Sequence, residues 1–140
     1  MEIPLEILNL HDDGFHLLVD VVIYQKSFKA VIDTGASRTV FDKTLISELA
    51  LPEALLNTEK LSTGLGTTSI ESFLIRIPDL KIGNLLLSPS EYVVIDLSNI
   101  NNVYETMQLQ SVVGVIGGDI LMRFKAIIDY NRLILKLFKD

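Results

Sequence analysis

The sequence predicts an all-β domain, mainly β with two short helices, folded into a closed β-barrel. Three observations favour this class. Apolar and polar residues alternate with a period of two along most of the chain, turn-forming residues recur about every eight to twelve positions, and only two short segments have clear helical spacing. The 140 residues, 49% of them hydrophobic, suffice for one core but not for two lobes. We therefore expect a single domain over residues 1–140.

The expected elements follow one another as short strands with few interruptions. Runs rich in β-branched and aromatic residues predict strands at 3–8, 15–24, 28–32, 39–41, 55–61, 69–77, 80–87, 92–97, 112–116, 126–129 and 133–138. Asp42 has the place of an N-cap for a helix that ends before Pro52. A second short helix is expected over residues 119–124, with Asp119 as its cap, whereas residues 99–110 fit either a short helix or a loop.

Composition and charge exclude several classes of function. The formal net charge is −6 and no Lys/Arg block occurs, which argues against a nucleic-acid partner. Without cysteine there is no disulfide, thiol nucleophile or thiolate metal site. His11 and His16 would either share a metal or lie solvated in a turn, and we favour the turn because nothing nearby completes a zinc set. We expect no metal and no cofactor, since a nucleotide-binding glycine loop is also missing.

The chain has no sequence signal for a membrane. No apolar run approaches the roughly 18 residues that span a bilayer. The acidic start, Met-Glu-Ile-Pro-Leu-Glu, lacks the basic and apolar stretches of a signal peptide. These features favour a cytoplasmic protein with no membrane partner, although a chain that had lost a leader would have the same features.

The residues that carry chemistry gather where an apolar strand ends. Residues 30–37 read Ala-Val-Ile-Asp-Thr-Gly-Ala-Ser, so a buried strand leads into Asp33, Thr34 and Gly35. A carboxylate in this place would lie against the core and would need hydrogen-bond donors, because burying an unpaired charge is costly. Gly35 offers its N–H, and its missing side chain leaves space for a second chain or a substrate. An ordinary Asp-Thr-Gly turn is the alternative.

A second segment strengthens the functional interpretation. Residues 113–121, Val-Gly-Val-Ile-Gly-Gly-Asp-Ile-Leu, form an apolar strand that ends in paired glycines before a helix. Glycines at such a corner allow two backbone segments to approach closely. This strand is therefore expected to lie beneath the Asp33 loop and to hold it.

Together these segments resemble the retropepsin-like (retroviral-type) aspartic protease family, and the single domain resembles its bacterial-like members. The pattern consists of two apolar residues before Asp-Thr-Gly-Ala and, about eighty residues later, two apolar residues and Gly before a short helix. The resemblance covers about residues 15–138, and it implies the acid-protease fold with one Asp-Thr-Gly lobe per chain.

Residue by residue, the resemblance implies that Asp33 is the catalytic aspartate. It implies supporting roles for Thr34, Gly35, Ala36, Val115, Ile116 and Gly117. In these roles the Thr34 hydroxyl makes cross-subunit contacts and Gly35 donates to the carboxylate. The hairpin tip at Gly64, Leu65 and Gly66 has the place of the family's flap, which closes over substrate, and a plain hairpin turn is the alternative.

The implied activity is that of an aspartic endopeptidase, and its mechanism requires a homodimer. Peptide hydrolysis of this kind needs two carboxylates about 3 Å apart that share one proton. The chain contains a single Asp-Thr-Gly, so the second Asp33 would come from a twofold-related copy acting on the same polypeptide substrate. Two alternatives stay open: an inactive peptide-binding or interaction module that retains the fold, and a structural β-domain in which Asp33 is a turn residue.

Two features depart from the family's compact members. The segment 85–110 lengthens the chain, and it would decorate the barrel, join the dimer contact or block the cleft. Arg38 follows the Asp33 loop, where it would either pair with Asp42 or Asp119 or remain a solvated charge.

Overall fold

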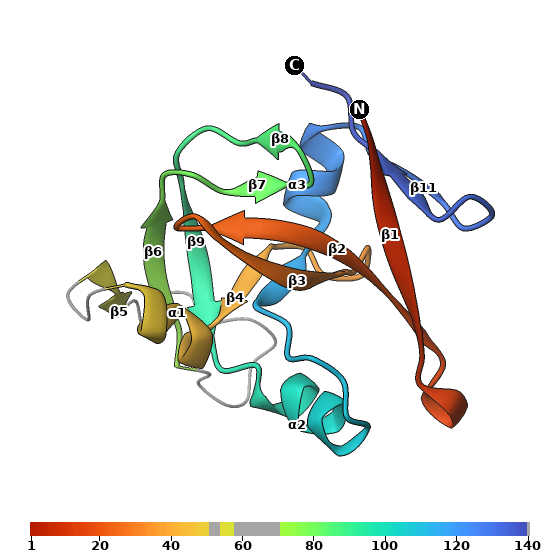
Figure 1. Ribbon diagram of the computed structural model, residues 1–140. Helices are drawn as coiled ribbons and strands as arrows, with labels where there is room; N and C mark the ends of the chain where they lie inside the picture. The colour runs from red at the N-terminus through yellow and green to blue at the C-terminus, as the bar shows by residue number, and fades with distance from the viewer. Residues whose placement is uncertain (51–53, 58–70, 140) are drawn as a thin grey trace.

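Twelve strands, three α-helices and one turn of 3-10 helix make up the part of the chain that this computed structural model describes, residues 1–50, 54–57 and 71–139 (Figure 1). The strands are β1 (Glu2–Asn9), β2 (Phe15–Ile23), β3 (Lys26–Ile32), β4 (Val40–Asp42), β5 (Leu56–Asn57), β6 (Phe73–Ile77), β7 (Lys81–Ile82), β8 (Leu85–Leu86), β9 (Ser90–Ile95), β10 (Gly114–Ile116), β11 (Ile127–Asp129) and β12 (Ile134–Lys136). The helices are η1 (His11–Asp13), α1 (Lys43–Leu49), α2 (Ser98–Thr106) and α3 (Gly118–Arg123). The predicted all-β class is confirmed.

All twelve strands belong to one connected sheet. Its order is β11-β12-β1-β2-β3-β10-β4-β9-β6-β5, with the β7–β8 hairpin attached to β2. The two ends of this path, β11 and β5, do not pair with each other, so the sheet is open over the described residues rather than closed as predicted. Most neighbours are antiparallel, but β10 runs parallel to β3 and β4 runs parallel to β9.

The first and last strands of the chain lie side by side. The first half of β1 pairs with β12, from Glu2 opposite Lys136 to Pro4 opposite Ile134, and its second half pairs with β2. The backbones of Met1 and Leu137 continue this ladder with two hydrogen bonds of 2.9 Å. The first and last strands, β1 and β12, are therefore paired with each other within a single copy of the chain.

The long hairpin of β2 and β3 carries the centre of the sheet. Its strands pair over seven positions, from Leu17 opposite Ile32 to Ile23 opposite Lys26. Tyr24 and Gln25 form the turn alone with φ of 49° and 66°, the left-handed conformation that two-residue hairpin turns require. This tight turn is why β3 begins two residues earlier than predicted.

Asp42 caps α1, as predicted, and also ties the helix to the rest of the sheet. Its Oδ2 accepts the Leu45 N–H at 3.1 Å, while Oδ1 accepts the Leu97 N–H at 2.9 Å. The side chain lies buried, where both backbone donors compensate its carboxylate. The end of β4 is thereby connected to the segment that follows β9.

Alternate residues of β2, β3 and β10 point into two separate apolar clusters on opposite faces of the sheet. The larger cluster contains Leu17, Ile32 and Ile116 from these strands. The smaller cluster consists of Leu10, Leu18, Val31, Leu97, Tyr104, Val112 and Val115. Of the ambiguous segment 99–110, residues 99–106 belong to the helix α2, whose buried residue is Tyr104, and residues 107–110 form a turn and loop.

Candidate active site

Asp33 lies directly after β3, where β2, β3 and β10 meet. The parallel ladder places Val31 beside Val115 and Ile32 beside Ile116. It extends one residue further, because the Asp33 N–H donates to the Ile116 carbonyl at 3.0 Å. The backbone position of the aspartate is therefore set by the sheet.

The carboxylate of Asp33 is oriented by the loop that follows it. The Gly35 N–H donates to Asp33 Oδ1 at 2.9 Å, and the Ala36 N–H donates to the Asp33 carbonyl at 3.2 Å. A Cβ on residue 35 would lie 3.2 Å from that carboxylate oxygen, so glycine permits the close approach. Asp33, Thr34 and Gly35 are all exposed. The prediction that Asp33 lies against the core was wrong, because its side chain projects beyond the last residue of β3 into an open pocket.

The paired glycines after β10 lie against the same loop. A Cβ on Gly117 would lie 2.7 Å from the Arg38 carbonyl carbon and oxygen and 2.8 Å from the Ala36 oxygen. The Gly118 N–H donates to the Ala36 carbonyl at 2.7 Å. Two backbone segments distant in sequence are thus in van der Waals contact beneath the Asp33 loop.

Hydrogen bonds between Thr39 and Asp119 stabilise this contact, and this pair was not predicted from the sequence. Both the N–H and the hydroxyl of Thr39 donate to Asp119 Oδ1, at 2.9 and 2.7 Å, and the Thr39 hydroxyl accepts the Gly117 N–H at 3.0 Å. The interpretation of Asp119 as the helix cap was wrong, because Gly117 is the N-cap of α3. Nor does Arg38 form an ion pair with Asp42 or Asp119 among the described residues, whose ion pairs include Lys29–Asp20, Lys43–Glu71 and Arg132–Glu2.

Replacing Thr39 by Val should lower the free energy of unfolding by about 1–3 kcal/mol. The substitution keeps the shape but leaves the buried Gly117 N–H without its acceptor. Thr39→Ser, which keeps the hydroxyl, is the matched control and should lose less than half as much. Urea denaturation measures both values, and a Val variant as stable as the Ser variant would contradict the role of this hydroxyl.

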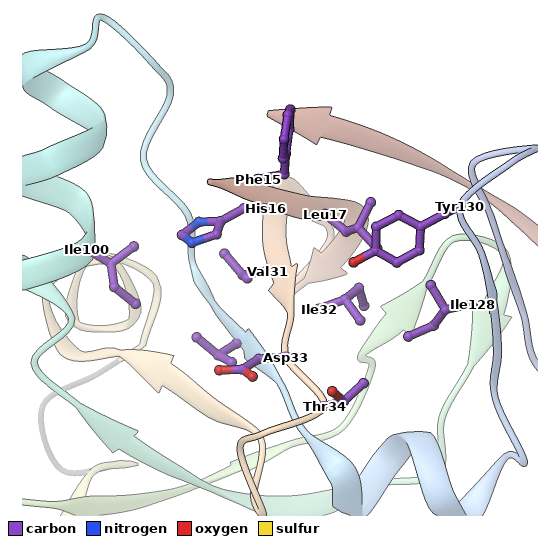
Figure 2. Close-up of a pocket in the computed structure, with 11 residues that line it drawn as sticks. Phe15, His16, Leu17, Val31, Ile32, Asp33, Thr34, Ile100, Ile128 and Tyr130 are labelled. Atoms are coloured by element: carbon purple, nitrogen blue, oxygen red, sulfur yellow. The ribbon is translucent and has the colours of Figure 1, made fainter. Parts of the chain in front are cut away.

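Asp33 faces a pocket of about 450 Å³ with two walls (Figure 2). Its lining consists of Phe15, His16, Leu17, Val31, Ile32, Asp33, Thr34, Ile100, Val115, Ile128 and Tyr130. Figure 2 shows His16, Val31 and Ile100 on one side of β3 and Leu17, Ile32, Ile128 and Tyr130 on the other, with Asp33 at the end of the strand. These walls continue the two apolar clusters of the core.

His16 belongs to this pocket and not to a solvated turn, so its predicted place was wrong. The residue is half-buried, and its Nδ1 lies 2.6 Å from the hydroxyl oxygen of Tyr104. Burial raises the pKa of Tyr104 to about 12, so its hydroxyl remains protonated at neutral pH. The sequence offered no signal for this contact, because the two residues are 88 positions apart.

The segment 85–110 contributes to the same pocket. Ile100 on α2 lines the wall beside Asp33, and Tyr104 on the same helix is hydrogen-bonded to His16.

Gly64, Leu65 and Gly66, predicted as the flap, lie outside the described residues. Across residues 1–50, 54–57 and 71–139, no three His, Cys, Asp or Glu side chains group as metal ligands would. None of the helices in these ranges is long and apolar enough to cross a bilayer.

Residues 19–120 match the model of a protein family described as aspartyl protease. The chain belongs to this family. The matched span covers well over half of the chain and includes Asp33, β3, β10 and Gly117. A search of curated proteins found no match.

Solved structures of three proteins share the fold. A retropepsin-like aspartic protease from Rickettsia conorii is similar with a TM-score of 0.61 and 20% identity, over 99% of this chain and 88% of that one. The retroviral protease-like domain of Ddi1 from Leishmania major has a TM-score of 0.59 and 21% identity, over 87% of each chain. EIAV protease, in complex with the inhibitor HBY-793, has a TM-score of 0.54 and 19% identity, over 80% and 90%. The fold is therefore retropepsin-like.

Proposed function

We propose that this protein is an aspartic endopeptidase that hydrolyses peptide bonds as a homodimer, with Asp33 as its catalytic residue. One observation carries the proposal. This chain belongs to the aspartyl protease family, and its Asp33 carboxylate is exposed at the end of β3. The Gly35 N–H orients this carboxylate, which faces a pocket of about 450 Å³.

The chemistry of the pocket requires a second carboxylate. Among the lining residues that the structure describes, Asp33 is the single carboxylic acid. In the proposed dyad, two Asp33 side chains share one proton across a twofold axis. The ionised member accepts a proton from a water molecule as the water attacks the peptide carbonyl, while the protonated member donates to the developing oxyanion. A proton then reaches the leaving amine, and the pair titrates as one unit.

The surface beside Asp33 suits a second copy of the chain. Phe15 and Tyr130 lie on the pocket rim and are 62% and 63% exposed, and the Thr34 hydroxyl is exposed between Asp33 and Gly35. Aromatic side chains of this size are often buried in interfaces. These aromatic side chains lie next to Asp33, which requires the Asp33 of a second copy, and their position supports docking of that copy at this rim. The substrate is a polypeptide bound in an extended conformation.

A subunit-mixing experiment tests the shared dyad. Wild type and Asp33→Asn subunits are mixed in equal amounts, allowed to exchange, and assayed for cleavage of a peptide mixture by mass spectrometry. If both Asp33 side chains are needed, only about one quarter of the dimers are active after random exchange. Independent catalytic chains would retain about one half of the activity, which would contradict the dyad. Mixing with Asp12→Asn, an exposed acid that does not line the pocket, should leave activity unchanged.

A further inference from the structure

We infer that the α2 side of the Asp33 pocket is a subsite for one substrate side chain with an apolar stem and a neutral hydrogen-bond acceptor at its end, such as glutamine. In this subsite Ile100 limits the size of the side chain and His16 donates the hydrogen bond. The inference rests on the proposed function in taking the ligand to be a polypeptide, but it concerns residues that the aspartate chemistry does not require.

The helix that supplies Ile100 is rigidly docked. Asn101 binds the backbone of Val112 twice, accepting its N–H at 2.8 Å and donating to its carbonyl at 3.1 Å. Tyr104, one helical turn after Ile100, is only 1% exposed and packs in the smaller apolar cluster. Since both anchors lie on α2, Ile100 has a fixed place in the wall and not the freedom of a loop residue.

The stem of the ligand meets an apolar wall. Val31 and Val115 are paired neighbours on β3 and β10, and Ile100 packs against the cluster that contains them. All three line the pocket. One further or missing methyl group on such a wall changes which side chains fit, because a well-packed site tolerates little change of volume.

The hydrogen-bond donor follows from the partners of Tyr104. In the part of the chain that the structure describes, His16 Nδ1 is the single partner of the Tyr104 hydroxyl. A buried hydroxyl proton without an acceptor is costly, so the favoured arrangement has Tyr104 donating to Nδ1. With Nδ1 as the acceptor, the imidazole carries its proton on Nε2, which has no partner among the described residues. This N–H is available to a ligand in the pocket that His16 lines (Figure 2).

Charge selects a neutral acceptor over an anionic one. Asp33 lies in the same pocket, and a dyad that shares one proton keeps one negative charge. The whole chain carries a formal charge of −6. A glutamate side chain would therefore be repelled, whereas a glutamine amide accepts the His16 N–H without this cost.

The test compares peptides that differ at one position. A randomised peptide mixture first identifies cleaved sequences, and matched peptides with Gln, Glu or Met at each side of the cleaved bond are then assayed. We expect wild type to favour Gln over Met by about 2- to 10-fold in kcat/KM, the discrimination that one hydrogen bond supplies. His16→Phe should abolish or reverse this preference. Val103→Ala, an exposed residue of the same helix, should leave it unchanged.

Two more variants separate size from hydrogen bonding. Ile100→Ala should raise the use of Phe or Trp at the selected position by about tenfold relative to Met. Tyr104→Phe removes the group that fixes the imidazole, so kcat/KM for the Gln peptide relative to the Met peptide should fall. A purely structural role of Tyr104 would instead lower the rates for both peptides equally.

The outcomes distinguish this inference from the proposed function. If wild type cleaves peptides with equal preference for Gln and Met, the subsite is refuted and the protease activity stands. If wild type cleaves nothing, the same peptides, labelled with a fluorophore, are titrated against it by anisotropy. Tighter binding of the Gln peptide, lost in His16→Phe, would support the subsite and refute only the catalysis. Equal binding of all peptides would overturn the subsite.

Discussion

Substitution of Asp33 by Asn should lower kcat for peptide cleavage by about 10²–10⁴-fold and leave the fold intact. Asn cannot share a proton as the proposed pair of Asp33 carboxylates would, and loss of a general acid–base pair has effects of about 10²–10⁴-fold. The change should cost less than about 1 kcal/mol in stability, because the exposed side chain accepts one hydrogen bond, from Gly35, which the Asn oxygen also accepts.

The measurement is single-substrate kinetics beside thermal denaturation of the same samples. Asp12→Asn removes an exposed carboxylate with the same change of charge and is the matched control. Cleavage by the Asp33 variant within tenfold of wild type would place the chemistry elsewhere in the molecule.

Gly117→Ala should destabilise the protein by about 2–3 kcal/mol, whereas Gly118→Ala should be neutral or slightly stabilising. The added methyl group at Gly117 would approach backbone atoms of Ala36 and Arg38 to within 2.7–2.8 Å, and backbone cannot rotate away as a side chain can. At Gly118 the nearest atom is 3.4 Å distant, and alanine favours the helix that begins there.

Guanidinium denaturation of the two variants measures this contrast, and proteolytic activity measures its functional consequence. We expect Gly117→Ala to lose most activity as well, because the displaced segment is the loop that orients Asp33. Equal stability of the two variants would mean that the loop adjusts freely, and the close approach would then have no role in holding the site.

Features that depend on neighbouring residues could be predicted from the sequence. The alternation of apolar residues predicted the strands, and Asp42 beside a helical pattern predicted its cap, since both are local effects. The Gly35 hydrogen bond is also local, because donor and acceptor are two residues apart.

Contacts between distant segments could not be predicted in the same way. Thr39 and Asp119 are 80 residues apart, and each is an ordinary residue of its own element. Nothing in residues 98–106 alone indicates that Ile100 lines the same pocket as Asp33, because the helix reaches the pocket through packing of Tyr104 against distant parts of the chain such as Leu18 and Val115. The open sheet was missed for a related reason: periodicity predicts strands but not which two edges pair.

The parallel pairing of β3 with β10 has a consequence for the order of events during synthesis. The Asp33 loop leaves the ribosome more than 80 residues before Ile116, Gly117 and Asp119, which supply its supports. A partly synthesised chain therefore carries the aspartate on a loop that lacks its contacts with β10 and the start of α3. Since such distant pairings form late, the proposed catalytic loop gains its supporting contacts only after residues 116–119 have been synthesised. The topology itself thus separates synthesis of the Asp33 loop from formation of its supports by about eighty residues of chain growth.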